Sequence, residues 1–266
     1  MSYSIEPLIE AAACEGLLAD VNAFIDQAYT PENVRARRSY VYEYAIAAEA
    51  FAFAVHCPGS EASAHLPGFQ LDELPASLAE TTRVACEKMG VTEGRVLFNA
   101  TRYPEHCEAL APHYDGELFE FDVHPVQGST IYRAIRPRRV GVLTLRNDSV
   151  GCGTTLHDAD EKVTETHASA GEFLMFDNTV YQHGVPATGV AHEAAPKGPD
   201  PRWIRVAIGW RAFEQDCFYW NDGEPLRPID MGEAVSLQEE FLAEGWPLQI
   251  DAALERASFP FPKRYV

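Results

Sequence analysis

Two histidines of this chain are each followed, two positions on, by a carboxylate. The pairs are His106-x-Glu108 and His113-x-Asp115, and both lie in the stretch RYPEHCEALAPHYDG (102–116). On an extended segment, residues i and i+2 point to the same side, so either pair can present an imidazole and a carboxylate to one metal ion. Such a pair needs a third ligand from elsewhere in the chain.

The spacing alone identifies no site. With 40 acidic residues among 266, nine histidines are expected to have an acid two positions on about once by chance. A candidate third ligand is His183, which follows an expected strand and a polar turn in EFLMFDNTVYQHGVPAT (172–188). Two histidines and one carboxylate on one face, with other positions open, are the ligands typical of non-heme Fe(II) oxygenases.

The region that must position these ligands is predicted to be rich in strands. From about residue 94 the chain consists of short β-branched or aromatic runs, separated by Gly, Asn, Asp or Pro. The runs are RVLFNATRY (95–103), LFEFDV (118–123), RRVGVLTLR (138–146), KVTETH (162–167), EFLMFD (172–177) and RWIRVAIGWRAF (202–213). Short strands at this density predict a β-sandwich or jelly roll and not a parallel α/β sheet.

Helical patterns flank the β region on both sides. They cover IEPLIEAAACEGLLADVNAFIDQAY (5–29), a new start at Thr30-Pro31, ASLAETTRVACEKMG (76–90), which ends at Gly90, and MGEAVSLQEEFLAEG (231–245). We therefore expect a single domain over 1–266. It has a helical N-terminal flank (1–93), a double-stranded β-helix core of the jelly-roll, cupin-like kind (94–213) and a C-terminal flank (214–266).

Composition and charge limit the classes of function. A hydrophobic fraction of 46% is that of a folded globular protein. A net charge of −19 disfavours contact with nucleic acid phosphates or anionic membrane. No signal peptide or membrane span is visible, and six cysteines without a C-x-x-C pair are expected to be reduced thiols. We expect a cytoplasmic protein with a small-molecule substrate, no nucleic acid and no membrane; the oligomeric state stays open.

An ordered set of motifs over residues 95–213 resembles the Fe(II)/2-oxoglutarate-dependent dioxygenases, especially their prolyl-hydroxylase-like and small-molecule hydroxylase branches. A strand ending in Tyr103-Pro104 precedes the H-x-D by ten residues, and VLTLRN (142–147) followed by GCGTTL (151–156) resembles the family's strand and turn. ASAGEFLMFDN (168–178), His183 and the strand that begins at Arg205 then follow in the family's order.

This resemblance implies the roles of particular residues. His113, Asp115 and His183 are the implied iron ligands, and His106-x-Glu108 is then a coincidence in an exposed loop. Arg205 is the implied partner of the far carboxylate of 2-oxoglutarate, because a guanidinium in a β core supplies a two-donor fork. Arg202 and Arg211 compete for that role, and the 22 residues between His183 and Arg205 are more than the family commonly has.

Thr154 and Tyr103 are candidates for hydroxyl contacts to the same co-substrate. The implied cofactors are Fe(II), 2-oxoglutarate and O2, with release of succinate and CO2. Related halogenases carry Gly or Ala at the position of Asp115, so the carboxylate favours hydroxylation over halogenation. Desaturation or ring formation stays open.

Four arginines stand out against the acidic background in YRAIRPRRV (132–140): Arg133, Arg136, Arg138 and Arg139. They can face an anionic substrate, such as an amino acid, with Arg133 and Arg136 as the candidate contacts. They can equally form salt bridges on the rim of the protein. The loop ATGVAHEAAPKGPDP (187–201) has the composition of a mobile lid.

Two other classes of function fit the same pattern. A cupin-type metal dioxygenase or isomerase that does not use 2-oxoglutarate shares the β core and the His/Asp ligands but needs no arginine facing an anion. A jelly-roll binding module without catalysis needs neither iron nor turnover. The other histidines have no neighbouring motif that indicates a metal site, and His157 is expected in an acidic turn. They lie at positions 56, 65, 124, 157, 167 and 192.

Overall fold

The computed structural model describes residues 3–36, 38–42, 49–115, 117–118, 122–123, 130–131, 133–149, 151, 153–189, 203–221 and 224–244. The strands of the first half are β1 (Tyr3–Pro7), β2 (Ser39–Tyr42), β3 (Glu49–His56), β4 (Arg95–Pro104), β5 (Leu110–His113), β6 (Glu117–Leu118), β7 (Asp122–Val123), β8 (Thr130–Ile131) and β9 (Arg133–Pro137). Those of the second half are β10 (Arg139–Asn147), β11 (Thr154–His157), β12 (Val163–Thr166), β13 (Glu172–Asp177), β14 (Gln182–Val185), β15 (Trp203–Ala212), β16 (Cys217–Asn221) and β17 (Arg227–Ile229).

Helices occupy both ends of the chain. They are α1 (Cys14–Ala28), α2 (Pro31–Arg35), α3 (Ala76–Met89) and α4 (Met231–Glu244), with single 3-10 turns at Ala11–Ala13, Glu61–Ser63 and Leu71–Glu73. Among the helices in the described ranges, none is long and apolar enough to cross a membrane.

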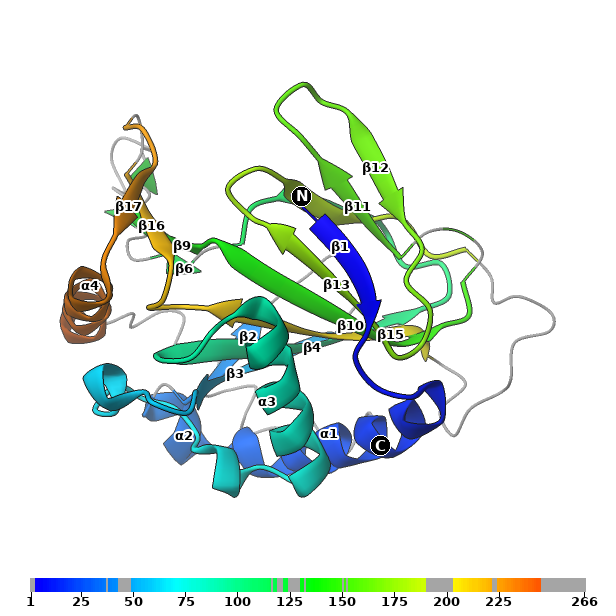
Figure 1. Cartoon of the computed structure of the whole chain (residues 1–266), viewed down its shortest axis with the longest axis horizontal. Helices are drawn as coiled ribbons and strands as arrows, with labels where there is room; N and C mark the ends of the chain where they lie inside the picture. The colour runs from blue at the N-terminus through cyan, green and yellow to red at the C-terminus, as the bar shows by residue number, and fades with distance from the viewer. Residues whose placement is uncertain are drawn as a thin grey trace.

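Two antiparallel sheets form the core of the fold. The larger has the strand order β1-β13-β10-β15-β4-β3-β2, and the smaller has the order β12-β11-β14-β5. Strands adjacent in the sequence alternate between the sheets, as in β10, β11, then β13, β14 and β15, which is the winding of a jelly roll. The predicted double-stranded β-helix is therefore confirmed (Figure 1).

Alternation along β15 separates the core from the site. Val206, Ile208 and Trp210 pack into the main hydrophobic core. Arg205 and Arg211 have the opposite parity, and both reach residues on the smaller sheet's side. Because side chains of a strand alternate between its two faces, one face of β15 is apolar, and the other directs two arginine side chains into the interior of the jelly roll.

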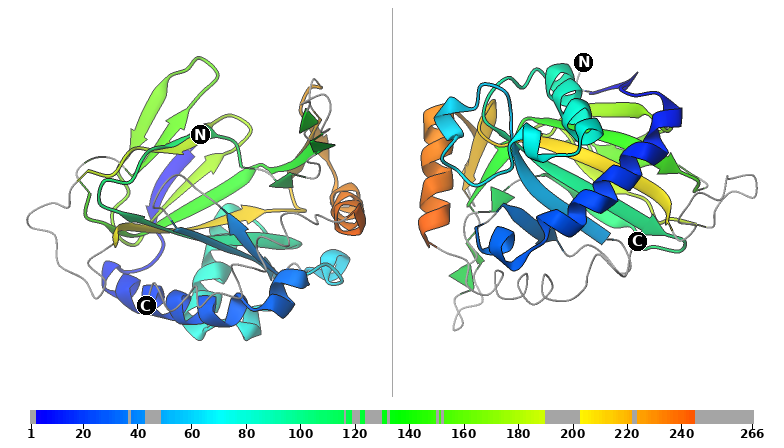
Figure 2. Two further views of the ribbon diagram at one scale, coloured as in Figure 1. Left: turned by 180° about the vertical axis from the view of Figure 1, so that it is seen from behind. Right: turned by 90° about the horizontal axis from the view of Figure 1, so that it is seen from below.

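The apolar face of the large sheet is covered by α1 and α3 (Figures 1 and 2). Apolar residues at helical spacing on α1, such as Leu17, Val21 and Phe24, are buried against it. Gly90 ends α3 with φ of 67°, a left-handed conformation that glycine adopts without strain. The Thr30 hydroxyl accepts the N–H of Asn33 and caps α2 at the predicted position.

The N-terminal flank, expected to be helical, contains strands as well as helices. Strands β1, β2 and β3 all fall within residues 1–93 and extend the large sheet at both edges. Pro7 lacks the N–H that a helix interior requires, so the segment before α1 pairs with β13 instead. In β3, large residues alternate with alanine, and this period of two is a strand pattern within an apolar run.

A smaller sheet of order β17-β16-β9-β6 lies to one side of the jelly roll, together with α4 (Figures 1 and 2). Its strand β9 directly precedes β10 in the chain, and its strand β16 follows β15. The expected strand at 118–123 is present only as β6 and β7 at its two ends, because residues 119–121 lie outside the described part of the chain. The proposed lid at 187–201 likewise falls outside it from residue 190 onward.

Candidate metal centre

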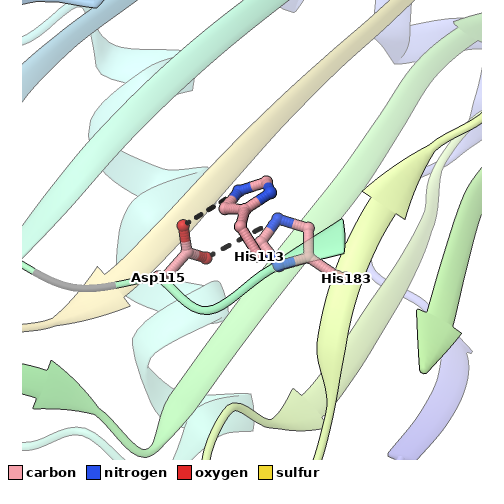
Figure 3. Close-up of side chains that lie close together, drawn as sticks. All are labelled: His113, Asp115 and His183. Atoms are coloured by element: carbon pink, nitrogen blue, oxygen red, sulfur yellow. Dashed lines mark ion pairs between the residues drawn. The ribbon is translucent and has the colours of Figure 1, made fainter. Parts of the chain in front are cut away.

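His113, Asp115 and His183 lie close enough together to bind one metal ion (Figure 3). Among the described residues, this is the group of three metal-ligating side chains that meets this condition. His113 is the last residue of β5, and His183 lies opposite it on β14 in the register of the small sheet. Asp115 follows β5 by two residues and points to the same side as His113. One ligand atom from each lies within 4.8 Å of the others.

Both imidazoles direct Nε2 toward the carboxylate. Nε2 of His113 lies 3.9 Å from Oδ1 of Asp115, and Nε2 of His183 lies 3.8 Å from Oδ2. These separations are too long for hydrogen bonds. Nδ1 of His113 lies 2.9 Å from the carbonyl oxygen of Ala111, and this contact suits the tautomer with its proton on Nδ1. The lone pair of Nε2 is then free to bind a metal.

The carboxylate is held ionised although it is buried. Burial by itself raises the pKa of Asp115, but the charge of Arg211, then His183, the hydrogen bond from Arg211 and His113 together lower it to about 2. Nε of Arg211 lies 2.6 Å from Oδ1 of Asp115. Burial lowers the pKa of His183 to about 4 against the opposing effect of Asp115, so this imidazole is neutral at pH 7. An ionised carboxylate and a neutral imidazole are the states that a metal requires of its ligands.

Asn178 fixes the backbone on which Asp115 sits. Its Oδ1 accepts the N–H of Asp115 at 2.9 Å, and its Nδ2 donates to the carbonyl of Asp115 at 2.8 Å and to that of Pro137 at 2.9 Å. The side chain is fully buried directly after β13. Asn178 therefore joins three segments of the chain at the cluster. The sequence signal was a polar residue directly after a strand, to which no role was assigned.

The predicted co-substrate residues meet at another point of the interior. Nη2 of Arg205 donates to Oγ1 of Thr154 at 3.2 Å, and its guanidinium carbon lies 5.1 Å from the ring centre of Tyr103. All three side chains are buried. Arg211, the competitor on the same face, is placed on Asp115 instead. Arg202, the other competitor, lies outside the described residues.

Between Arg205 and Arg211, the same face of β15 carries only Ala207 and Gly209. On the adjacent strand β4, Thr101 and Asn99 stand opposite these two small residues. Asn99 accepts a hydrogen bond from Thr101 at 2.6 Å, while its buried Nδ2 has no hydrogen-bond partner among the described residues. Sequence reasoning missed Asn99. Its signal was the parity that it shares with Tyr103 on β4.

The remaining histidines join no cluster in the part of the chain that the structure describes. His106 and Glu108 are exposed in the loop after β4, as expected for a coincidental pair. His157 lies 3.0 Å from the hydroxyl of Thr155, and His65 pairs with Glu239 at the surface. Arg133 opens β9, but its side chain lies outside the described part, as do His124 and His192.

Comparison with known proteins finds similar solved structures. No family model matches the sequence, and no curated protein matches it. A prolyl-4-hydroxylase from Pseudomonas putida is 14% identical, with 79% of this chain and 92% of that chain covered and a TM-score of 0.42. A putative 2OG-Fe(II) oxygenase family protein from Caulobacter crescentus is 11% identical over 90% of each chain, with a TM-score of 0.43.

SnoK, a non-heme alpha-ketoglutarate-dependent carbocyclase from nogalamycin biosynthesis, is 11% identical, with 86% of this chain and 89% of that chain covered and a TM-score of 0.44. Likeness at these scores carries no argument about activity, so the functional proposal rests on the residues of the site. The solved structures that this chain resembles include Fe(II)/2-oxoglutarate oxygenases, the same family that its sequence motifs resemble.

Proposed function

We propose that this protein is an Fe(II)/2-oxoglutarate-dependent oxygenase that hydroxylates a C–H bond of a small molecule and releases succinate and CO2. The observation that carries the proposal is the convergence of His113, Asp115 and His183 from separate segments, with the carboxylate held ionised in a buried site. A carboxylate and two imidazoles with open positions are the donor set suited to ferrous iron.

The residues fit a bound cation. Oδ2 of Asp115, which faces Nε2 of His183 at 3.8 Å, is buried without a hydrogen-bond partner among the described residues. A buried carboxylate oxygen in that state is costly unless a positive group meets it. In the proposed site Asp115, His113 and His183 bind the ion, and the five described cysteines, all buried elsewhere, supply no thiolate to it.

The interior also suits a dicarboxylate co-substrate. Arg205 offers a charge-matched fork for the far carboxylate, with the hydroxyl of Thr154 and the ring of Tyr103 beside it. Ala207 and Gly209 are the two small residues on the same face of β15 between Arg205 and Arg211. A cupin-type enzyme that needs no 2-oxoglutarate has no use for such an arginine.

When bound, iron with 2-oxoglutarate and O2 supplies the oxidising power, and the protein supplies orientation and charge. Arg211 keeps Asp115 in its ionised form, and Asn178 keeps the backbone of Asp115 in place. Arg205 fixes one end of the co-substrate. Burial of Asp115, His183 and Arg205 limits the access of bulk water to the reacting groups. The presence of Asp115 favours hydroxylation over halogenation.

The test is an anaerobic titration of the Fe(II) protein with 2-oxoglutarate. The wild type is expected to develop a visible metal-to-ligand charge-transfer band, and Asp115→Ala is expected to lose it. His106→Asn alters the other H-x-acid pair, at a position where φ is 56° and asparagine is tolerated, and is expected to keep the band. Stoichiometric Fe(II) binding with no band would favour a cupin-type enzyme, and no Fe(II) binding would favour a binding module.

A further inference from the structure

Three of the four arginines of residues 133–139 have side chains that the structure describes, and these three differ in their partners. Arg138 pairs with Asp177 at 2.9 Å, and Arg139 pairs with Asp216 at 3.0 Å. These two therefore form the salt bridges that an acidic surface predicts. Arg136 lies on β9, two residues before Arg138 and three before Arg139, and it has no carboxylate partner and no hydrogen-bond acceptor for its side chain among the described residues.

Aromatic rings hold Arg136 instead. Its guanidinium carbon lies 4.3 Å from the ring centre of Tyr114 and 5.0 Å from that of Trp220. The side chain is half-buried, and this burial lowers the pKa of Arg136, with Tyr114 acting in the opposite direction. Ring faces attract a cation but accept no in-plane N–H bond. A cation in this state is unusual in a chain with 40 acidic and 21 basic residues.

The position of Arg136 connects it to the metal centre. Tyr114, on which it rests, is the residue between the two ligands His113 and Asp115. The next residue, Pro137, accepts a hydrogen bond from Asn178, which also binds the backbone of Asp115. Asn178 thus connects the backbone next to Arg136 with the backbone of Asp115.

Arg205 lies near the start of β15, whereas Arg136 lies on β9, beyond the end of β15. Arg211, which contacts Asp115, is six residues from Arg205, or about 20 Å along an extended strand. β9 and β16, which carry Arg136 and Trp220, lie at the side where β10 begins and β15 ends (Figures 1 and 2). The strand that carries Arg136 therefore lies beyond the end of β15 that is nearer to Arg211, away from Arg205.

We propose that Arg136, held between Tyr114 and Trp220, binds the carboxylate of a small-molecule substrate and so places it at the metal centre. The placement rests on the proposed oxygenase function, whereas the carboxylate site itself does not. The rings of Tyr114 and Trp220 accept no in-plane N–H bond from the guanidinium, and its planar pair of N–H donors matches a planar carboxylate. A phosphate dianion would call for a second cation, and the adjacent Arg138 and Arg139 are committed to Asp177 and Asp216.

The experiment uses benzoate as the probe and benzamide as its neutral counterpart. Each is titrated by calorimetry into the anaerobic Fe(II) protein with saturating 2-oxoglutarate, which occupies the site at Arg205. Wild-type protein is expected to bind benzoate at least about tenfold more tightly than benzamide, and Arg136→Gln is expected to remove that difference, because a charge-assisted pair is lost. Arg138→Gln, two residues along and already paired with Asp177, is the matched control and keeps the difference.

Arg136→Lys provides a second variant that retains the charge but not the fork, and an intermediate affinity for benzoate is expected. Equal binding of benzoate by the wild type and Arg136→Gln, no preference over benzamide, or tighter binding of phenyl phosphate than of benzoate would each overturn the carboxylate site. The charge-transfer band is recorded in the same samples. A band with indifferent benzoate binding refutes this site alone, and the absence of a band refutes the oxygenase.

Discussion

Asp115 is the residue on which the proposed chemistry depends, and Arg211 is the residue that allows it to be buried and ionised. Only 6% of Asp115 is exposed, and Arg211 contacts it at 2.6 Å. Removing one member of a buried ion pair leaves the other charge without compensation. Arg211 and a bound divalent cation therefore stabilise the same carboxylate in two different ways.

This relation predicts the behaviour of Arg211→Gln. The metal-free variant is expected to lose about 3 kcal/mol or more of unfolding free energy, the usual consequence of breaking a buried pair. Mn(II) then supplies the missing positive charge, so it should raise the melting temperature of the variant more than that of the wild type. Thermal unfolding with and without Mn(II) measures both effects.

Arg138→Gln is the control for that comparison, because its exposed pair contributes at most about 1 kcal/mol. A Mn(II)-induced shift in Arg211→Gln no larger than in the wild type would show that Arg211 does not hold the charge of Asp115.

At this scale, the sequence predicted which three side chains converge, because H-x-D spacing and the order of strands constrain them. It could not separate Arg205 from Arg211. The two have the same parity on one strand, and only their partners on other strands, Thr154 and Asp115, distinguish them. The roles of these residues in binding iron and co-substrate stay predictions.

Among the elements, β10 depends on close contact between a strand and an aromatic ring. A Cβ added at Gly141 would lie 2.1 Å from the ring of Phe173, which is fully buried on β13. Gly141→Ala is expected to destabilise the protein by about 1–3 kcal/mol, because the packed ring must move. Gly16→Ala on α1 is the matched control. It meets no atom within 4 Å and should stabilise by about 0.5–1 kcal/mol.

Denaturant unfolding of both variants measures the difference. If Gly141→Ala proved as stable as the wild type, the sheet would not be packed as described at this position.

His56 at the end of β3 makes the stability of that strand depend on pH. Burial, then the charge of Arg95, lowers the pKa of His56. As the pH falls below about 6.5, the unfolded chain therefore takes up a proton at this position before the folded chain does, and the unfolding free energy decreases. The loss attributable to His56 approaches at most about 1.4 kcal/mol per pH unit.

His56→Leu removes the titrating group, so its unfolding free energy should fall less steeply than that of the wild type between pH 7 and pH 5. Parallel curves for the two proteins in urea unfolding would rule out this contribution.

Strands β4, β10, β13 and β15 could be predicted because each is a long apolar run with clear boundaries. β1 and β3 could not be assigned in the same way. β1 is short and merges in sequence with the helical pattern of α1. β3 is an alanine-rich run, and alanine favours helices, although the run alternates with period two and buries its phenylalanines.

Across the whole molecule, the jelly roll places two cationic positions on either side of one acidic and imidazole cluster. Arg205 lies toward one end of β15, and Arg136 lies on β9, in the sheet of order β17-β16-β9-β6 beyond the other end. In a protein whose net charge is −19, these two positions are where the proposal places an anionic co-substrate and an anionic substrate. The division of residues 1–266 into one domain with two flanks stays a prediction.

The most direct test is a crystal structure of the anaerobic protein with Fe(II) and 2-oxoglutarate, in which iron is located by its anomalous scattering. One iron peak is expected within bonding distance of His113, Asp115 and His183, with the far carboxylate of 2-oxoglutarate on Arg205. An iron peak at another position, or none at full Fe(II) loading, would contradict the account.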